Sequence, residues 1–298
     1  MPFVGELSAL SCAIIWSITA FVYKQASDKM SSLQINAIRL ISSSIYLIIL
    51  VLGFTGLSEM STMQFVLLSA SGLIGLVLGD TFIFKSYELM SPRLTSLFLT
   101  VNPAMAAMIA FVWLGEGLSL TTVLGIGITI SGIAIVLGEG AKGEKLFSKI
   151  SKRGILFCIL STFFNAIQLT LTKEVFQMGN GQIDALTVAL VRIGSATLLV
   201  YPVAYAMKKD LSIRKVVRSE PSMTLKLAVA SFFGTFIAIA LSFVAVVKTE
   251  IGVAATLMST TPILMIPVSQ FLYKEKPTWH SIVGAIVAVG GVAILFMK

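Results

Sequence analysis

The chain has 298 residues, of which 56% are hydrophobic and 12% charged, and its mean hydropathy is +0.95. Soluble domains carry roughly 25% charged residues, so this composition excludes an ordinary soluble protein and indicates an integral membrane protein. The net charge is +8, but the basic residues fall between apolar segments, which argues against a nucleic-acid partner and is typical of charges that orient a membrane protein.

Ten segments are apolar and long enough to cross a bilayer, which takes about 20 residues. In the first half they are residues 3–23, 33–53, 63–88, 92–114 and 119–138. In the second half they are residues 154–173, 183–207, 223–247, 251–272 and 278–297. The sequence therefore predicts an all-α membrane protein with ten transmembrane helices.

The two halves repeat each other. Four residue pairs are separated by 159 positions: Pro103 and Pro262, Glu116 and Glu275, Gly125 and Gly284, and Gly132 and Gly291. Because each half has an odd number of spans, the second half must enter the membrane in the opposite sense, as in an inverted repeat. We expect a five-helix repeat at residues 1–138, a basic linker at 139–152 and a second five-helix repeat at 153–298.

Pro103 and Pro262 interrupt the fourth and ninth spans. A proline inside a helix removes a hydrogen bond and kinks the helix, and a membrane tolerates the break where neighbours or cavity water satisfy the freed carbonyl. Asn102 and Thr261, just before the prolines, either satisfy such carbonyls or face a substrate. An equal alternative is that the prolines only shape the helix bundle.

Asp80 lies near the middle of the third span, and Ile239 occupies the matching position of the second half. A carboxylate at that depth costs about 2.5–3.5 kcal/mol, so it should face the bundle interior or a wet cavity. One reading makes it a proton-coupling group or a counter-charge for a cationic substrate. The other pairs it structurally with Arg39 or Lys85.

Arg39 and Arg192 occupy matching positions in the second and seventh spans. Their long side chains either snorkel to the membrane interface or contact a substrate or gate.

Two spans carry a stripe of polar residues at helical spacing, which either lines a cavity or holds helices together. The stripes are Trp16, Thr19 and Tyr23 in span one and Asn165, Gln168 and Thr172 in span six.

Small residues at four-residue spacing indicate close helix packing within the bundle; the pairs are Gly127 with Ser131 and Gly284 with Ala288.

The sequence contains none of the common catalytic or nucleotide-binding motifs. The chain has no phosphate-binding loop, and its one histidine, His280, cannot form an H-E-x-x-H zinc motif. We therefore expect no cofactor, no metal site and no enzymatic activity.

Several of these features resemble the EamA-type transporters of the drug/metabolite transporter superfamily. They are the ten spans in two halves, "AIIWS" with Trp16, "NAIRL" with Arg39, and in each half a proline-containing helix, "LGE" or "YKE", and a glycine-rich helix. The resemblance implies a secondary transporter, often an exporter of amino acids or other small metabolites, with a cavity between the halves. The sequence departs from the family in two places: a Trp-Gly pair that is common in span one is here Trp16-Ser17, and the matching position of the second half is Asn165. Because these positions lie where a substrate would be sensed, the resemblance does not identify the substrate.

The predicted function is alternating-access transport of a small metabolite such as an amino acid, with protons as a candidate coupling ion. A membrane-embedded enzyme or lipid-handling scaffold is the alternative, and we expect a monomer or weak homodimer. The predicted substrate-binding residues are Trp16, Asp80, Asn102, Asn165, Gln168 and Ser259. Asp80, Arg39 and Arg192 are the predicted coupling or gating residues.

The distribution of basic residues predicts the orientation in the plasma membrane. The odd-numbered loops carry 17 of the 22 Lys and Arg residues, whereas the even-numbered loops and the C-terminus carry 3. Cytoplasmic loops are enriched in Lys and Arg, so the odd loops should be cytoplasmic and both termini outside. The family resemblance implies cytoplasmic termini instead, and we follow the charges because they belong to this chain.

Overall fold

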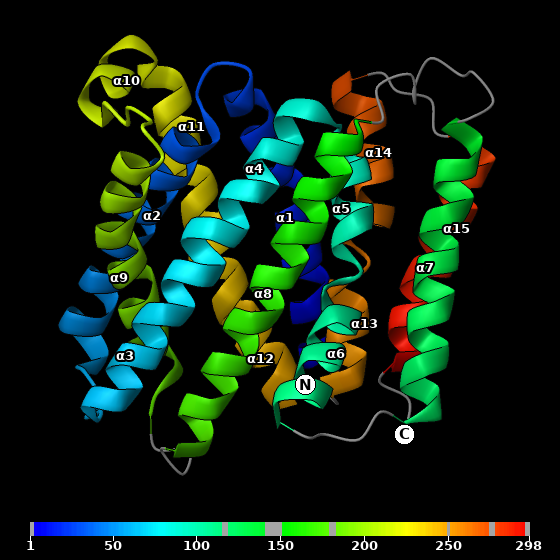
Figure 1. Ribbon diagram of the computed structural model, residues 1–298, viewed down its shortest axis with the longest axis horizontal. Coiled ribbons are helices and arrows are strands. Elements are labelled where there is room, and N and C mark those ends of the chain that lie inside the picture. The colour runs from blue at the N-terminus through cyan, green and yellow to red at the C-terminus, as the bar shows by residue number, and fades with distance from the viewer. Residues whose placement is uncertain are drawn as a thin grey trace.

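The computed structural model describes residues 3–114, 119–140, 151–178, 183–248, 251–273 and 278–295. All regular elements in these ranges are helices (Figure 1). The first half contains α1 (Val4–Ser27), α2 (Ser32–Leu50), the π-helix η1 (Val51–Thr55), α3 (Thr62–Ser71), the π-helix η2 (Gly72–Gly79), α4 (Asp80–Leu89), α5 (Pro92–Leu99), α6 (Asn102–Leu114) and α7 (Leu120–Gly140). The second half contains α8 (Lys152–Met178), α9 (Ala185–Ala206), α10 (Ile213–Ser219), α11 (Pro221–Ser231), the π-helix η3 (Phe232–Ile237), α12 (Ala238–Lys248), α13 (Ile251–Met258), α14 (Thr261–Tyr273) and α15 (Trp279–Leu295).

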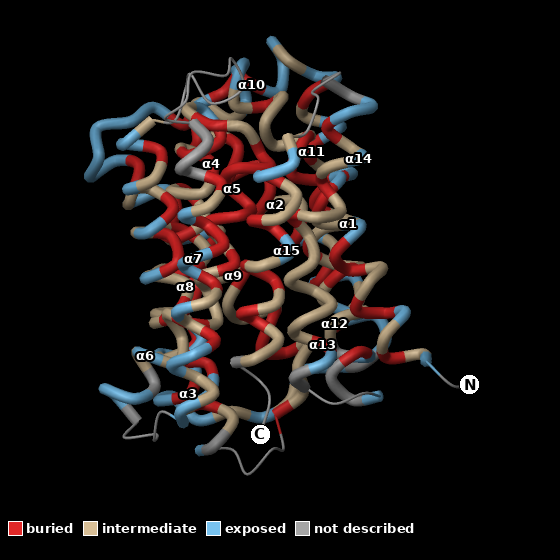
Figure 2. Tube along the Cα trace, turned by 90° about the vertical axis from the view of Figure 1, so that its right-hand side faces the viewer, coloured by how far each residue is buried: buried red, intermediate tan, exposed pale blue. Residues whose placement is uncertain are grey.

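Within these ranges, eight helical segments are long and apolar enough to cross a membrane: Val4–Ser27, Ser32–Phe54, Thr62–Leu89, Pro92–Trp113, Lys152–Phe176, Ala185–Ala206, Pro221–Ser242 and Val253–Phe271. Two further apolar stretches, Leu120–Val136 in α7 and Trp279–Ile294 in α15, are shorter. Large apolar side chains such as Leu198 and Phe271 point outward, while buried residues gather inside the bundle (Figure 2). The chain is therefore an all-helical, multi-pass membrane protein.

The helices pass back and forth between the two ends of the bundle. Helix α1 begins, and α15 finishes, at the end marked by both termini, while α10 lies across the opposite end (Figure 1). Helix α8, which opens the second half, runs in the opposite sense to α1. Most of the predicted linker, residues 141–150, and the predicted pair Glu116 and Glu275 lie outside the described residues.

The fourth and ninth spans are each broken into two helices rather than kinked. Helix α5 finishes at Leu99 and α6 begins at Asn102, while α13 finishes at Met258 and α14 begins at Thr261. Pro103 and Pro262 are thus the second residues of new helices. Proline fits there because residues of the first turn need no intrahelical N–H bond. The prolines mark the breaks, as predicted, but they do so by starting helices.

Threonine hydroxyls satisfy carbonyls at both breaks. Thr100 Oγ1 donates to the carbonyl of Leu97 at 2.6 Å, and Thr260 Oγ1 donates to that of Leu257 at the same distance. Each carbonyl also accepts the backbone N–H of the same threonine at 3.2 Å, so the hydroxyl adds a second hydrogen bond at the end of the helix. The two halves therefore stabilise their breaks in the same way.

Helices α7 and α15 pack together through small residues. A Cβ atom added to Gly132 would lie 2.4 Å from the backbone nitrogen of Ala288, and one added to Gly291 would lie 2.4 Å from that of Thr129. Gly284 also lies in this contact, as predicted. The predicted face of α7 is wrong, because Gly127 and Ser131 are exposed and a Cβ on Gly127 meets no atom within 4 Å.

Asp184 caps the N-terminus of α9. Its carboxylate accepts hydrogen bonds from the backbone N–H groups of Leu186 (2.7 Å) and Thr187 (2.9 Å) and from the Thr187 hydroxyl (2.6 Å). Its own N–H donates to Ser58 Oγ at 3.3 Å, joining α9 to the turn before α3. Partial burial tends to raise the carboxyl pKa, but these hydrogen bonds outweigh burial and hold the pKa below its usual value.

Replacing Asp184 with alanine is expected to lower the free energy of unfolding by about 1 kcal/mol at pH 7, since the cap is lost. Because folding lowers the pKa, the part of this contribution that depends on charge is present above the ordinary value of about 4 and disappears as the pH falls through the lowered value. The difference in melting temperature between wild type and Asp184→Ala should therefore shrink at acid pH. Asp184→Asn, which keeps a capping oxygen without a charge, is the control. Equal melting temperatures at pH 7 would contradict the capping role.

Candidate functional site

A cavity of about 340 Å³ lies in the middle of the bundle, between the two halves of the chain. Helices α1, α2, α4, α5 and α6 of the first half and η3, α13 and α14 of the second half contribute to its wall. Both helix breaks border it: the wall includes Asn102 and Pro103 at one break and Ser259 and Pro262 at the other. Interrupted helices beside a central cavity are where secondary transporters bind their substrates.

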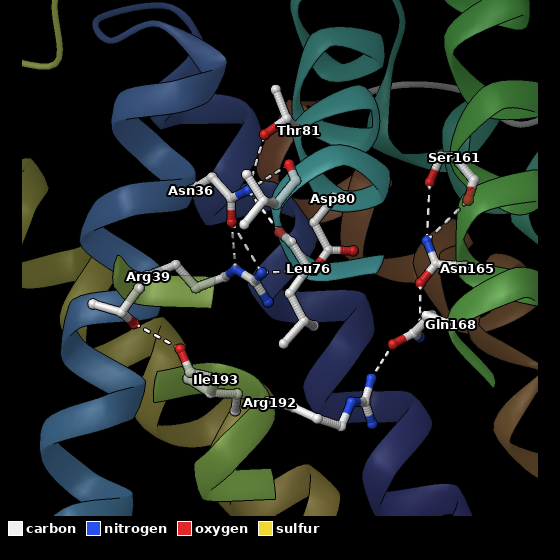
Figure 3. A network of polar contacts seen from close by, with 12 residues as sticks. Asn36, Arg39, Leu76, Asp80, Thr81, Ser161, Asn165, Gln168, Arg192 and Ile193 are labelled. Atoms are coloured by element: carbon white, nitrogen blue, oxygen red, sulfur yellow. Dashed lines mark hydrogen bonds and ion pairs between the residues drawn. The ribbon is translucent and has the colours of Figure 1, made fainter. Parts of the chain in front are cut away.

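An ion pair lies in the wall of this cavity. Arg39 Nη2 on α2 donates to Asp80 Oδ2 at the start of α4 over 2.6 Å, and the two side chains are only 11% and 14% exposed. Of the two predicted partners for Asp80, the structure selects Arg39. Lys85 instead lies over the rings of Phe82 and Phe157, at 5.3 Å from each centroid. The snorkelling reading of Arg39 is wrong, because its guanidinium turns into the bundle (Figure 3).

Asn36, which the sequence analysis did not single out, positions this pair. Its Oδ1 accepts hydrogen bonds from Arg39 Nη2 (3.0 Å) and Nε (3.3 Å). Its Nδ2 donates to the carbonyls of Leu76 (2.8 Å) and Val77 (3.2 Å) in η2 and to Thr81 Oγ1 (2.9 Å). One fully buried amide therefore joins α2 to the π-helix that precedes Asp80. Asn36 is one turn before Arg39, so helical spacing was the available signal.

Trp16 forms another part of the wall. Its indole Nε1 donates to the carbonyl of Gly234 in η3 at 3.0 Å. Thr19 lies close to the same glycine, since a Cβ on Gly234 would be 3.1 Å from Thr19 Oγ1. Trp16, Thr19 and Tyr23, the stripe predicted in span one, all line the cavity. The π-helix η3 thus borders the cavity through Gly234, whereas η2 ends directly before Asp80 and contributes no residue to the wall.

The cavity wall combines aromatic surface with uncharged polar groups. The rings of Tyr23 and Phe84 are 5.1 Å apart, and the Arg39 guanidinium lies 5.6 Å from the Phe84 centroid. Asn102 Oδ1 is buried and accepts no hydrogen bond from any described residue. At the other break, Thr261 Oγ1 donates to the carbonyl of Met258 at 2.9 Å. Of the two residues before the prolines, Thr261 satisfies a carbonyl and Asn102 offers an acceptor.

Asn165 and Gln168 were predicted to line the cavity, but neither is part of its wall. They face two glycines instead: a Cβ on Gly79 would be 3.0 Å from Asn165 Nδ2, and one on Gly75 would overlap Gln168. The polar stripe of span six therefore packs α8 against η2. Polar residues at this helical spacing can line a cavity or pack against another helix. Because Gly75 and Gly79 lie directly across from Gln168 and Asn165, these side chains pack against η2.

Arg192 joins this polar stripe from α9. It donates to Gln168 Oε1, Gln168 Nε2 donates to Asn165 Oδ1 at 3.1 Å, and Asn165 Nδ2 donates to the carbonyl of Ser161 at 3.0 Å (Figure 3). Arg192 Nε is buried and has no hydrogen-bond partner among the described residues. Arg192 therefore contacts the polar stripe of α8 and is not part of the cavity wall.

Within the described part of the chain, no three His, Cys, Asp or Glu side chains gather as metal ligands would. The site consists of an ion pair, aromatic rings, hydroxyls and an amide. Such groups can bind and orient a small polar molecule.

Comparison with known proteins agrees with this description. A protein of Clostridium kluyveri described as "Uncharacterized transporter" is 28% identical to this chain over 145 residues, which are 49% of this chain and 45% of that protein. The match thus spans less than half of that relative's length. A solved structure described as "Crystal structure of protein" has the same fold, with a TM-score of 0.65 and 15% identity, covering 98% of this chain and 96% of the other.

The model of the EamA-like transporter family matches the chain twice, over residues 3–138 and 152–297. The two matches together cover nearly the whole sequence and meet the expectation drawn from the "AIIWS" and "NAIRL" segments. The chain therefore belongs to the EamA-like transporter family of the drug/metabolite transporter superfamily.

Proposed function

We propose that this membrane transporter is a secondary exporter of a small metabolite, such as an amino acid, working by alternating access through the central cavity. The proposed architecture has ten spans in two inverted five-helix repeats, residues 1–138 and 153–298, joined by the basic linker 139–152. The opposite senses of α1 and α8 support it. The observation that carries the proposal is the cavity bordered by matching helix breaks from both halves.

The proposed substrate-binding residues are Trp16, Asp80, Asn102 and Ser259. Asp80 and Arg39 offer a carboxylate and a guanidinium whose charges balance, which suits a substrate that carries both charges and no net charge. Trp16 offers an aromatic face, and Asn102 brings a buried amide oxygen that has no hydrogen-bond partner among the described residues. An amino acid satisfies all of these groups, with its ammonium near Asp80 and its carboxylate near Arg39.

Asp80 and the two arginines are the proposed coupling elements. Arg39 and Arg192 come from matching positions of the two halves and approach the Asp80 region from different sides (Figure 3). Protonation of Asp80 would break its ion pair with Arg39 and so loosen α4 from α2 at the cavity wall. The protein is proposed to work as a monomer or weak homodimer in the plasma membrane.

The proposal is tested by flux into liposomes. Candidate solutes come from a thermal-shift screen of metabolites, because a ligand that binds the folded protein raises its apparent stability. A transporter moves a hit saturably and recovers it unchanged. A membrane-embedded enzyme would return a chemically altered solute, and a lipid-handling scaffold would give no solute flux.

Single-cysteine variants test which residues line the transport path. In a background without Cys12 and Cys158, Asn102→Cys and Ser259→Cys should react with a membrane-impermeant thiol reagent, and bound solute should slow the reaction. Asn165→Cys should react at least tenfold more slowly, since α8 packs this side chain against Gly79. Equal rates at the three positions would contradict the assignment of the wall.

Membrane orientation is tested with a reporter fused after Lys298 that is active only in the cytoplasm. Lys208, Lys209, Arg214, Lys215 and Arg218 all lie at or beside α10, at the end of the bundle opposite the termini. If that end is cytoplasmic, as the positive-inside rule predicts, the reporter should be inactive. Strong activity in correctly inserted protein would mean that the orientation is the reverse.

A further inference from the structure

A basic cluster on α10 has no role in the cavity. Helix α10 connects α9 to α11 across one end of the bundle (Figure 1). Its side chains Arg214, Lys215 and Arg218 are exposed and, with Ser212 and Ser219, border a shallow hollow. From Lys208 to Lys226 inclusive, the chain has six basic residues and two acidic ones. Glu220, one of those two, is already paired with Lys29 at 2.7 Å.

Helix α10 is firmly attached to the bundle. Val216 on its inner side is buried, and Ile213 packs against the same core cluster as Met30 and Met223. Leu211, just before the helix, is buried, and its carbonyl accepts a hydrogen bond from Gln34 Nε2 at 3.1 Å. The inner face of α10 is therefore occupied, and its basic groups are held on the outer face.

The surroundings of α10 place it at the membrane interface. Tyr205, in the last turn of α9, is 87% exposed, and tyrosines are enriched at the level of lipid headgroups. Leu225 on α11 is also exposed, as expected of a lipid-facing side chain. On α10 itself, Val217 is 40% exposed beside the basic residues. An exposed apolar residue among basic ones is the pattern of a helix that lies in the interface of an anionic bilayer.

We propose that the outer face of α10, with Arg214, Lys215 and Arg218, binds the headgroups of anionic phospholipids. Guanidinium and ammonium groups around a hollow match phosphate oxygens in charge and hydrogen bonding. Phospholipid is the proposed occupant because the exposed apolar and aromatic side chains of Val217 and Tyr205 accompany the basic groups, and such side chains suit contact with acyl chains. At the two ends of α10, the salt bridge of Lys29 to Glu220 and the bond of Gln34 to Leu211 connect the helix to the turn after α1 and to α2. Both α1 and α2 contribute to the cavity wall.

Lipid preference at α10 can be measured by fluorescence quenching. Val217→Cys carries an environment-sensitive fluorophore, and Cys12 and Cys158 do not compete for it because both are buried. The full-length protein is reconstituted in phosphatidylcholine vesicles with equal amounts of brominated phosphatidylglycerol or brominated phosphatidylcholine. We expect stronger quenching by the anionic lipid, equivalent to an enrichment of about fivefold for each engaged basic side chain.

Two matched controls make the result specific. The triple variant R214Q/K215Q/R218Q should lose the preference, whereas K152Q/R153Q, which removes charge at the start of α8, should keep it. A fluorophore at Leu57→Cys, exposed in the turn between α2 and α3 near the opposite end, should show no preference.

Three outcomes would overturn the proposal. They are equal quenching by both lipids in the wild type, a preference that survives the triple variant, and a preference that inorganic phosphate removes while chloride of the same ionic strength does not. The last would identify a free-phosphate site. None of these readings depends on transport, so they stand apart from the proposed function.

Discussion

Replacing Asp80 with asparagine is expected to abolish proton-dependent flux and to destabilise the protein. Asparagine keeps the size of the side chain but removes its charge, so the Arg39 guanidinium, 2.6 Å away, remains in the bundle without a counter-charge. Breaking a buried ion pair from one side costs about 3 kcal/mol or more. Flux into liposomes and the melting temperature of the purified protein are the measurements.

The double variant D80N/R39Q separates the two effects. It removes both charges, so it should recover much of the stability lost in Asp80→Asn while its flux stays at background. Arg39 and Asp80 are in direct contact, so their effects on stability are not additive. Normal proton-dependent flux in folded Asp80→Asn would contradict the coupling role. Recovery of flux in the double variant would mean that Asp80 serves only to neutralise Arg39.

The second large effect is expected at Gly132, where even alanine does not fit. Its Cβ would lie 2.4 Å from the backbone nitrogen of Ala288 and 2.7 Å from the carbonyl oxygen of Gly284. Backbone atoms of α15 cannot move aside as a side chain could, so the two helices must separate. Overpacking of this kind costs about 1–3 kcal/mol, and we expect Gly132→Ala to lie at the upper end.

Gly127→Ala is the matched control for Gly132→Ala. It adds the same methyl group to the same helix, and no atom lies within 4 Å of the position. Since alanine is the better helix former, its melting temperature should be unchanged or slightly higher. Equal losses in the two variants would mean that helix flexibility, and not the α7–α15 contact, determines the effect.

The sequence predicted the helical class, the family and a position for Asp80 inside the bundle, because composition, repeats and a charge within an apolar span are local signals. It could not choose between Arg39 and Lys85 as the partner of Asp80. The choice depends on how α2 faces α4, and the π-helix η2 directly before Asp80 departs from ordinary helical spacing and so rotates the following residues. No pattern in the sequence predicted the π-helix η2.

The faces of two stripes were also beyond sequence reasoning. In α7, Gly125, Gly127 and Gly132 are all small, and only the position of α15 shows that Gly132 is at the contact while Gly127 is exposed. In α8, Asn165 has the spacing of a cavity-lining residue, yet Gly79 across the contact leaves the space that it fills. Periodicity identifies a face, and tertiary packing decides what the face meets.

Counterflow in liposomes tests the central claim, alternating access through the cavity, most directly. Vesicles containing the protein are loaded with an unlabelled solute found by the thermal-shift screen and diluted into a trace of the labelled solute. Alternating access predicts that labelled solute transiently accumulates above its outside concentration. Asn102→Leu, which replaces a wall amide whose oxygen has no partner among the described residues with an apolar group, should reduce this accumulation. Labelled solute that only equilibrates, or that is recovered chemically changed, would contradict the account.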